Sequence, residues 1–543
     1  MNPLGNDRWN TALRRWALAA GAAVAASGAL AQGSSDAPVL LEVAQYAIEG
    51  ENPLSAEETQ AILAPHLGQH RALATIEAAA VALENALRSR GYSFHRVILP
   101  GQRPAAGVVR LRILQFPLAQ VTVTNNHHFT SENVLAALPA LQPGTPPDVN
   151  VLARDLSLAN EHPAKRLTIH IKESQKPDHL DAEVRVRDAP SSVAFASLTG
   201  GTKDRDDSIN RNTGYTRLTL GYQNSNLFDR DHALTLTYTT SPDHIDKVTQ
   251  LGAFYWAPLY GYHTTLNAYW TKSDVDTGSV GVGTQSFNVS GRGEFWGLRG
   301  TYALPKFGTV NHQASFALDN RYFESSVAAG GGALQTTPVG SRPLTLRYLA
   351  RHEQAEGGIG GYLEYVANLD GGSSNDAAAY NAARTGAPQR WNAWRYGVDA
   401  QYTLAGGWSL VGRLRGQQSR DALIPGEQFG LGGVGSVRGL RERETAGDKG
   451  YTVNLEAFAP QLEWGLTPYA FYDTGRRTYV KPVPGLTSSE SAASAGIGAR
   501  WNWQKNLELN ATLASVVDGI SLGTTPASDS GHAKLNFSLF YRF

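Results

Sequence analysis

The chain has 543 residues, enough for several domains. Its 48 basic and 48 acidic residues give a formal net charge of zero, so no bulk attraction to nucleic acid is implied. The sequence contains no Cys, which excludes a disulfide scaffold and leaves the compartment to be inferred from other features.

The N-terminus has the three-part pattern of a cleaved secretory signal. Arg8, Arg14 and Arg15 precede an apolar run over 16–26, and the small-residue site Ala-Leu-Ala follows at 29–31. The run is too short to cross a bilayer comfortably, which argues against a membrane anchor. We therefore expect residues 1–31 to be a signal peptide. No later stretch reaches the ~18 consecutive apolar residues of a transmembrane helix, so any membrane crossing would use strands.

Residues 38–188 show one small α/β unit twice. The first copy, 38–116, predicts a strand at 40–48, a helix from Ser55 with Glu58 at the capping-box spacing, a second helix after Leu73, and strands at 93–99 and 108–115. The second copy, 117–188, repeats the order with strands at 119–124, 167–172 and 180–187 and helices at 131–138 and 149–160. A repeat of about 75 residues indicates tandem small domains. Their short sheets offer unpaired edges to which an extended peptide can add a strand.

Residues 189–543 are predicted to be all β. Segments of about ten residues alternate apolar and polar positions between turns of Gly, Asn, Asp and Pro. Between Trp394 and Leu404, for example, apolar residues alternate with Arg395, Asp399 and Gln401. Charged residues on the second face are not explained by a soluble sandwich. The predicted fold is therefore mainly β, a transmembrane antiparallel barrel of about sixteen strands preceded by two small α/β domains. Side chains alone cannot fill so wide a lumen, which must either conduct or be plugged.

The last strand supports the same interpretation. From Ala533 to Phe543 one face is apolar and the chain stops on an aromatic residue, a pattern that resembles the recognition tag of bacterial outer-membrane barrels. The residues expected to form this C-terminal assembly signal are Phe537, Leu539, Tyr541 and Phe543. The outer-membrane assembly machinery is expected to recognise this signal.

A long polar connection, at about 418–450, lies between two predicted strands and is rich in Gly. It contains the sequence Val437-Arg438-Gly439. A later strand ends with Phe471-x-Asp473-x-Gly475, where Asp473 lies on the face opposite Tyr472. If the loop folds into the lumen, Arg438 and Asp473 could form a buried pair that fixes geometry more than it adds stability. From the residues alone, two unrelated solvated charges remain the alternative.

These features together resemble the two-partner secretion transporters (the haemolysin and haemagglutinin secretion-activation family) of the outer-membrane POTRA and β-barrel assembly-factor superfamily. The resemblance covers nearly the whole mature chain, and Gly91-Tyr92 and the run 99–102 also resemble the family's first POTRA domain. It implies that Arg438 of the loop meets Asp473 of the strand inside the barrel and holds the loop in a secretion-competent state. Gly439 and Gly475 would permit close approach.

Two departures from the family pattern stand out. Leu440 occupies a position where the family usually carries an aromatic residue, which puts a stacking role in doubt. Only residues 32–38 separate the expected cleavage site from the first strand, too few for the plug helix of many members.

Enzymatic interpretations are weak. Gly430-x-Gly432-x-x-Gly435 matches a dinucleotide fingerprint, but strand and helix flanks are not predicted there. Gly519 to Gly523 matches a nucleophile elbow at Ser521, followed by Asp529 and His532, without a following helix. His127 and His128 lack partners at metal-ligand spacing. We expect no catalytic residue, no metal site, no cofactor and, without a P-loop, no nucleotide.

The expected function is export of an unfolded partner protein across the bacterial outer membrane, with the two POTRA domains in the periplasm binding the partner. By resemblance the partner is a secreted exoprotein: an adhesin, a cytolysin or a contact-dependent toxin. The barrel also contacts the lipid bilayer, and no nucleic acid partner is expected. Two alternatives remain open, an insertase that assembles other barrels and a passive porin.

Overall fold

The computed structural model describes residues 41–103, 106–202, 214–274, 278–282, 285–289, 292–327, 335–481, 487–504, 506–520 and 528–543. The expected signal peptide, the segment 32–38 and Ser521 lie outside these residues. The chain divides into two compact units. Among the described residues, one contains those up to Asn85 together with those of 97–113, and the other contains 86–96 and those from Leu114 onward.

The first small domain is built on a three-stranded sheet with the order β2-β5-β4. Its elements are β1 (Leu41–Val43), β2 (Gln45–Glu49), α2 (Ala56–Leu63), η1 (Ala64–His66), β3 (Gly68–His70), α3 (Leu73–Ser89), β4 (His95–Ile98) and β5 (Val108–Gln115). Ser55 caps α2 by accepting from the Glu58 amide. The segment expected as one strand at 40–48 is two strands, because β1 pairs with β3 whereas β2 runs parallel to β5.

The second small domain repeats this topology. It contains β6 (Leu118–Thr124), α4 (Ser131–Ala136), α5 (Val149–Ala159), β7 (Lys165–Glu173) and β8 (Leu180–Asp188). Its sheet has the order β6-β8-β7, so the first strand is again parallel to the last. Apolar residues of α4 and α5, such as Val134 and Leu152, pack on Leu167 and Val184 of the sheet. One sheet face is therefore covered by helices.

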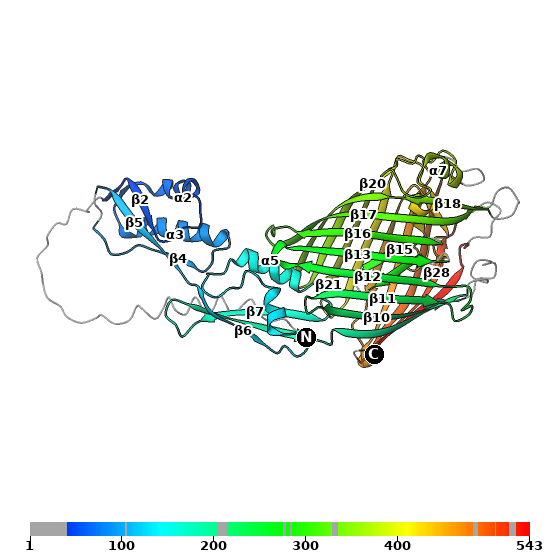
Figure 1. The fold of residues 1–543 in the computed structure, drawn as a ribbon, viewed down its shortest axis with the longest axis horizontal. Helices are drawn as coiled ribbons and strands as arrows, with labels where there is room; N and C mark the ends of the chain where they lie inside the picture. The colour runs from blue at the N-terminus through cyan, green and yellow to red at the C-terminus, as the bar shows by residue number, and fades with distance from the viewer. Residues whose placement is uncertain are drawn as a thin grey trace, which may run out of the picture. The chain divides into compact units, whose positions relative to one another are not determined.

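The rest of the chain forms a closed antiparallel barrel (Figure 1). Its strands are β9 (Ser192–Gly201), β10 (Thr216–Leu227), β11 (His232–Thr240), β12 (Gln250–Leu259), β13 (Thr264–Ser273), β16 (Gly293–Ala303), β17 (Val310–Val327), β18 (Gln335–Ser341), β19 (Pro343–Gln354), β20 (Gly357–Asn368), β21 (Asn392–Thr403), β22 (Ser409–Gln418), β25 (Lys449–Phe458), β26 (Leu466–Thr478), β27 (Ser489–Trp503), β28 (Leu507–Asp518) and β29 (Ala533–Arg542). β29 pairs with β9 and closes the sheet.

The predicted strand number is confirmed. β18 and β19 both pair with β17 and are separated only by Arg342, so they form one interrupted strand. Counted in this way, the described residues form sixteen barrel strands. Within the same residues, no helix has the length and apolar character needed to cross a bilayer.

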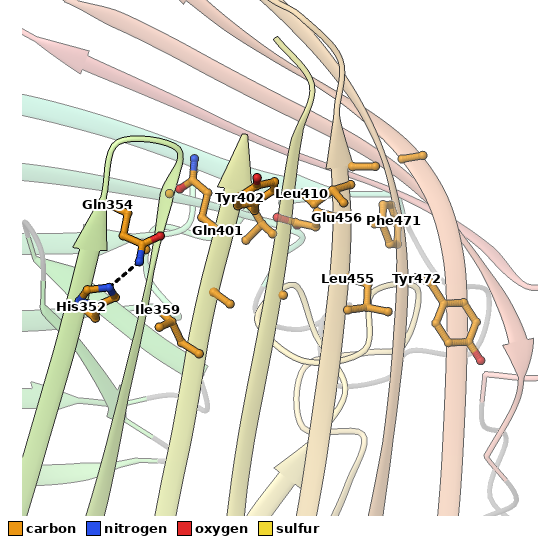
Figure 2. A pocket seen from close by; sticks show the side chains of 17 residues that line it. His352, Gln354, Ile359, Gln401, Tyr402, Leu410, Leu455, Glu456, Phe471 and Tyr472 are labelled. Carbon is orange, nitrogen blue, oxygen red and sulfur yellow. Dashed lines mark hydrogen bonds between the residues drawn. The ribbon is translucent and has the colours of Figure 1, made fainter. Parts of the chain in front are cut away.

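The two faces of the barrel wall differ in chemistry. On the outer face, the side chains of Leu455 and Tyr472 are 52% and 44% exposed. The residue that follows each of them in the strand, Glu456 and Asp473 respectively, faces the lumen and is buried. Figure 2 shows Leu455, Glu456, Phe471 and Tyr472 on neighbouring strands, around a pocket of about 730 Å³ that extends from β19 to β26. The outer face of this region is lined by apolar side chains, as lipid contact requires.

The ends of the barrel carry different additions. We call the end where β9 begins the near end, and the opposite end the far end. The helix α7 (Ala377–Ala383) lies at the far end, and α5 of the second small domain lies at the near end (Figure 1). A hairpin, β14 (Gly278–Val282) with β15 (Gln285–Val289), extends the connection between β13 and β16.

A buried ion pair joins the second small domain to the near end. Lys165 Nζ of β7 lies 2.6 Å from Asp231 Oδ2 in the turn between β10 and β11, and both side chains are at most 1% exposed. Tyr260 donates to the same carboxylate at 2.6 Å, and Lys165 also donates to Asn133 Oδ1 at 2.6 Å. Burial lowers the pKa of Lys165, and the charge of Asp231 opposes that shift. The pair is therefore a fully desolvated contact.

His162 completes this contact as a neutral ring. Burial lowers its pKa to about 4, so it is uncharged at neutral pH. Its Nδ1 accepts from the Ala164 amide at 3.1 Å, and its Nε2 lies 2.6 Å from the Ser225 carbonyl, which requires the Nε2–H tautomer. Nearby, burial raises the pKa of Asp155, 3.0 Å from His263 Nδ1, to about 6.

Replacing Asp231 by Ala should loosen the second small domain from the barrel. The change removes the carboxylate that pairs directly with the buried Lys165 ammonium, and loss of one member of a buried pair costs about 3–5 kcal/mol. The expected result is faster amide hydrogen exchange in 117–188 with the barrel still folded. The double variant Lys165→Met with Asp231→Leu removes both charges and should restore most of the protection. Equal loss in the single and double variants would contradict this account.

Candidate functional site in the barrel lumen

The connection between β22 and β25 folds inside the barrel. Its two arms form a short antiparallel hairpin, β23 (Phe429–Leu431) with β24 (Thr445–Gly447). Beyond the hairpin, Val437 and Leu440 are buried against Ala492 and Val516 of the inner wall. We call residues 419–448 the lumen loop.

Arg438 of the lumen loop is bound to the inner wall through all of its guanidinium nitrogens. Its Nε and Nη2 donate to the two oxygens of Asp473 at 2.7 Å each, a bidentate pairing. Its Nη1 donates to Glu456 Oε1 at 2.8 Å, and its backbone amide donates to Asp473 Oδ2 at 3.1 Å. The Phe471 ring lies 3.6 Å from the guanidinium carbon. Arg438 is 5% exposed and Asp473 fully buried, so the contact is desolvated.

The strand register brings the acceptors together. β25 and β26 pair antiparallel with Asn454 opposite Asp473 and Glu456 opposite Phe471. Side chains two residues apart on a strand share a face, so the inward-facing residues of β25 and their partners on β26 lie around the Arg438 guanidinium. Asn454 Nδ2 donates to Asp473 Oδ1 at 2.8 Å and also to the Ser436 carbonyl of the loop.

Glu456 and Asn454 were not among the candidates from the sequence. Glu456 also lies 2.9 Å from Arg413, so it balances charge from both the wall and the loop. Their sequence signal was the alternation along β25, the strand that follows the loop, in which Asn454 and Glu456 alternate with apolar residues such as Leu455. Antiparallel pairing of consecutive strands was needed to place them beside Asp473.

Leu440, which stands where an aromatic residue was expected by resemblance, is 2% exposed and packs among aliphatic side chains. The aromatic contact to Arg438 is supplied instead by Phe471 of the wall. In this structure, position 440 therefore contributes aliphatic packing, and the ring that stacks on Arg438 comes from β26.

The two motif glycines permit close approach. Gly439 has φ +94°, a left-handed conformation that disfavours side chains. A Cβ on Gly475 would lie 2.5 Å from Leu431 Cδ1 of the loop and 2.8 Å from the Tyr451 carbonyl. The loop therefore packs directly against the backbone of β26.

The other sequence candidates lie elsewhere. Gly432 and Gly433 of the fingerprint-like run adopt φ +115° and +96° in a turn after β23, and no helix follows. The His127 and His128 amides donate to Asp188 at 2.9 and 2.7 Å in the turn after β6.

The C-terminal residues lie on β29 or just beyond it. Leu539 pairs with Leu198 of β9 and with Leu509 of β28. Phe537 lies opposite Gly200, Tyr541 is 38% exposed, and Phe543 is 72% exposed after the strand.

Replacing Gly475 by Ala should displace the lumen loop. The new methyl group overlaps Leu431, and such overpacking costs about 1–3 kcal/mol. Limited proteolysis of the purified barrel is expected to cut the loop sooner. Gly412→Ala is the control, because its Cβ would meet only Leu455 Cδ2 at an ordinary 3.6 Å. An equal cleavage rate in both variants would contradict the packing role.

Comparison with known proteins places this geometry in a family. Residues 195–501 match the model of the haemolysin secretion/activation protein ShlB/FhaC/HecB, and residues 41–115 match the ShlB-type POTRA domain. The chain is 22% identical to the outer membrane transporter CdiB of Dickeya dadantii (strain 3937), over 83% of this chain and 78% of that protein.

Solved structures give the same fold. CdiB from Escherichia coli superposes with a TM-score of 0.74 at 15% identity, covering 95% of this chain and 93% of the other. CdiB from Acinetobacter baumannii gives 0.69 at 15% identity, covering 99% and 97%. The chain therefore belongs to the ShlB/FhaC/HecB family of haemolysin secretion/activation proteins, the outer-membrane transporters that export a partner protein in two-partner secretion.

Proposed function

We propose that the lumen loop, held by Arg438, obstructs the export path. We call its bound position on the inner wall the loop seat, and we propose that the loop must leave this seat before the partner polypeptide passes. The observation that carries this proposal is the fully paired guanidinium of Arg438 on Asp473 and Glu456. A cation removed from water is stable only with such partners, so the loop has one well-defined seat. A seat made of hydrogen bonds and small apolar contacts can also be left and regained without unfolding the barrel.

The partner is bound before export by the small domains on the periplasmic side. Edge strands support this step: β6 and β7 lie at the edges of the second domain's sheet, and β2 and β4 at those of the first. An extended segment that adds to such an edge bonds through its backbone, so varied sequences are accepted. Because β7 carries the exposed residues Thr168, His170 and Lys172 on the face away from the helices, we assign the main contact to this strand.

The exported partner is a secreted exoprotein, as the family implies. The chain passes in extended form, and folding outside the cell removes the extended form from equilibrium, which supplies direction without a nucleotide. A large secreted protein with repetitive β-helical sequence, encoded beside this gene, is the expected partner. The C-terminal residues Phe537, Leu539, Tyr541 and Phe543 serve earlier, as the signal read by the assembly machinery.

Arg438→Ala is expected to leave a folded barrel in the outer membrane but to impair secretion. Removing one member of the buried network weakens the loop seat by about 3 kcal/mol or more, which is over a hundredfold in the seated population. Secreted partner and heat-modifiable barrel are measured in the same cells. Arg415→Ala is the control, because Arg415 pairs with Asp399 of the neighbouring strand at 2.7 Å. Normal export by Arg438→Ala at normal barrel amounts would refute the loop mechanism.

The edge-strand contact can be tested by site-specific cross-linking, because the chain has no Cys of its own. His170→Cys on β7 and Glu132→Cys on α4 are each labelled with a photoactivatable maleimide and mixed with the unfolded N-terminal region of the partner. Cross-links are expected from position 170 and not from 132, which is exposed on the helical side. Stronger cross-linking from 132 would place the partner on the helices instead.

A further inference from the structure

A second buried charge centre holds the lumen loop on a different part of the barrel wall. Glu427 lies in η3 (Pro425–Glu427), on the first arm of the loop, and its side chain is fully buried. The carboxylate accepts from Arg321 of β17 at 2.9 Å, from Arg395 of β21 at 3.0 Å and from Ser341 of β18 at 2.6 Å. A desolvated carboxylate with three donors is as fully paired as the Arg438 guanidinium.

The two centres have opposite polarity. At Arg438 the loop supplies the cation and the wall strands β25 and β26 supply the anions. At Glu427 the loop supplies the anion, and β17 and β21 supply the cations. β17 and β21 are not neighbours in the barrel, since β18–β19 and β20 lie between them. Glu427 therefore links separated parts of the wall.

Large side chains surround the first arm of the loop. Leu423 and Ile424 are fully buried with Phe323, Tyr380 and Trp391, and a Cβ on Gly426 would lie 2.3 Å from the Phe323 ring. The loop beyond β23 packs instead on the smaller residues Ala492 and Val516.

Side chains at the two ends of the loop also clamp its backbone. Gln417 Nε2 donates to the carbonyls of Glu427 and Asp448 at 3.1 Å each. The Asp448 carboxylate accepts the amides of Leu423 at 2.8 Å and Val480 at 2.7 Å and pairs with Arg384. The first arm is thus fixed to the strand ends on both sides of the loop.

Two consecutive glycines lie between the two charge centres. Gly432 and Gly433 have consecutive positive φ angles of +115° and +96°, which other residues rarely adopt. Beyond them Val434 is 56% exposed, and a Cβ on Gly435 would meet nothing within 4 Å. Glycine can change backbone conformation at low cost, as a hinge requires.

We propose that Glu427 is a positioning residue that pins the root of the lumen loop, residues 422–428, to β17 and β21, so that export moves only the arm beyond Gly432 and Gly433. Arg438 is then the releasable contact and Glu427 the fixed one. This inference rests on the proposed function, because it specifies which part of the loop leaves its seat.

Spin-label distances in the intact barrel test the proposal. A reference label at Lys306→Cys, exposed in the periplasmic turn between β16 and β17, is paired either with Val434→Cys on the arm or with Gln428→Cys on the root. Each pair is measured in three backgrounds: the native loop, Arg438→Ala, and Arg438→Ala combined with Glu427→Gln. Heat-modifiable migration verifies folding of every variant.

With the native loop both distance distributions should be narrow. In Arg438→Ala the arm distribution is expected to broaden while the root distribution stays narrow. Adding Glu427→Gln removes the charge-assisted bonds and should raise the displaced root population at least about tenfold. Glu364→Gln is the matched control, because Glu364 lies on β20 within 4.0 Å of the same Arg395, and among the described residues its ion pairs are to wall arginines. It should leave the root distribution narrow.

The possible results distinguish the fixed root from the loop displacement on which it rests. Joint broadening of arm and root in Arg438→Ala would overturn the fixed root while leaving loop displacement intact. A narrow root in the combined variant would show that Glu427 pins nothing. An arm that stays narrow in Arg438→Ala would overturn both. If the combined variant does not fold, Ser341→Ala, which deletes one 2.6 Å bond to Glu427, takes the place of Glu427→Gln and should move the root in the same direction to a smaller extent.

Discussion

A charge taken out of water inside the barrel must be fully paired, and this constraint organises the transporter. A closed barrel of sixteen strands has a lumen wider than its own side chains can fill. The chain fills part of that space with a loop from its own wall, and the loop carries Arg438 into a desolvated site. Because the guanidinium offers donors in a fixed planar arrangement, two carboxylates and an aromatic ring at set positions satisfy it in one orientation of the loop.

Such a network defines position better than it provides stability. Desolvation offsets much of the Coulomb attraction of a buried pair, so its chief effect is to exclude alternative seats. That property fits the proposed function, in which the loop occupies a defined place at rest and leaves it during export. The opposite polarity of the Glu427 centre adds a second constraint, because the anion of the root and the cation of the arm each fit only one side of the wall.

The same chemistry recurs at the periplasmic end. Lys165 and Asp231 form a desolvated pair between the second small domain and the barrel, supported by Tyr260 and a neutral His162. Lys165 is the first residue of β7, the edge strand proposed to bind the partner. The ion pair to Asp231 therefore attaches this strand to the barrel. In the proposed function, the partner contact and the barrel contact therefore share one strand, β7.

Membership of the secretion family replaces the insertase and porin alternatives that the residues alone left open.

The sequence by itself determined the elements whose signals are local. Alternation with period two predicted the barrel and its strand number, the repeat of apolar and turn residues predicted two small domains, and Ser55 with Glu58 predicted a helix start.

Apart from Arg438 with Asp473, which the resemblance implied, tertiary structure alone decided which charges meet. Glu427 is separated from Arg321 by about a hundred residues, and nothing in the local pattern distinguishes it from a solvated surface carboxylate. Glu456 and Asn454 become partners of Arg438 only through the register of β25 and β26, and the strand expected at 40–48 divides because its halves pair with different strands. Periodicity shows which way a side chain faces, but the closure of the sheet determines what lies across from it.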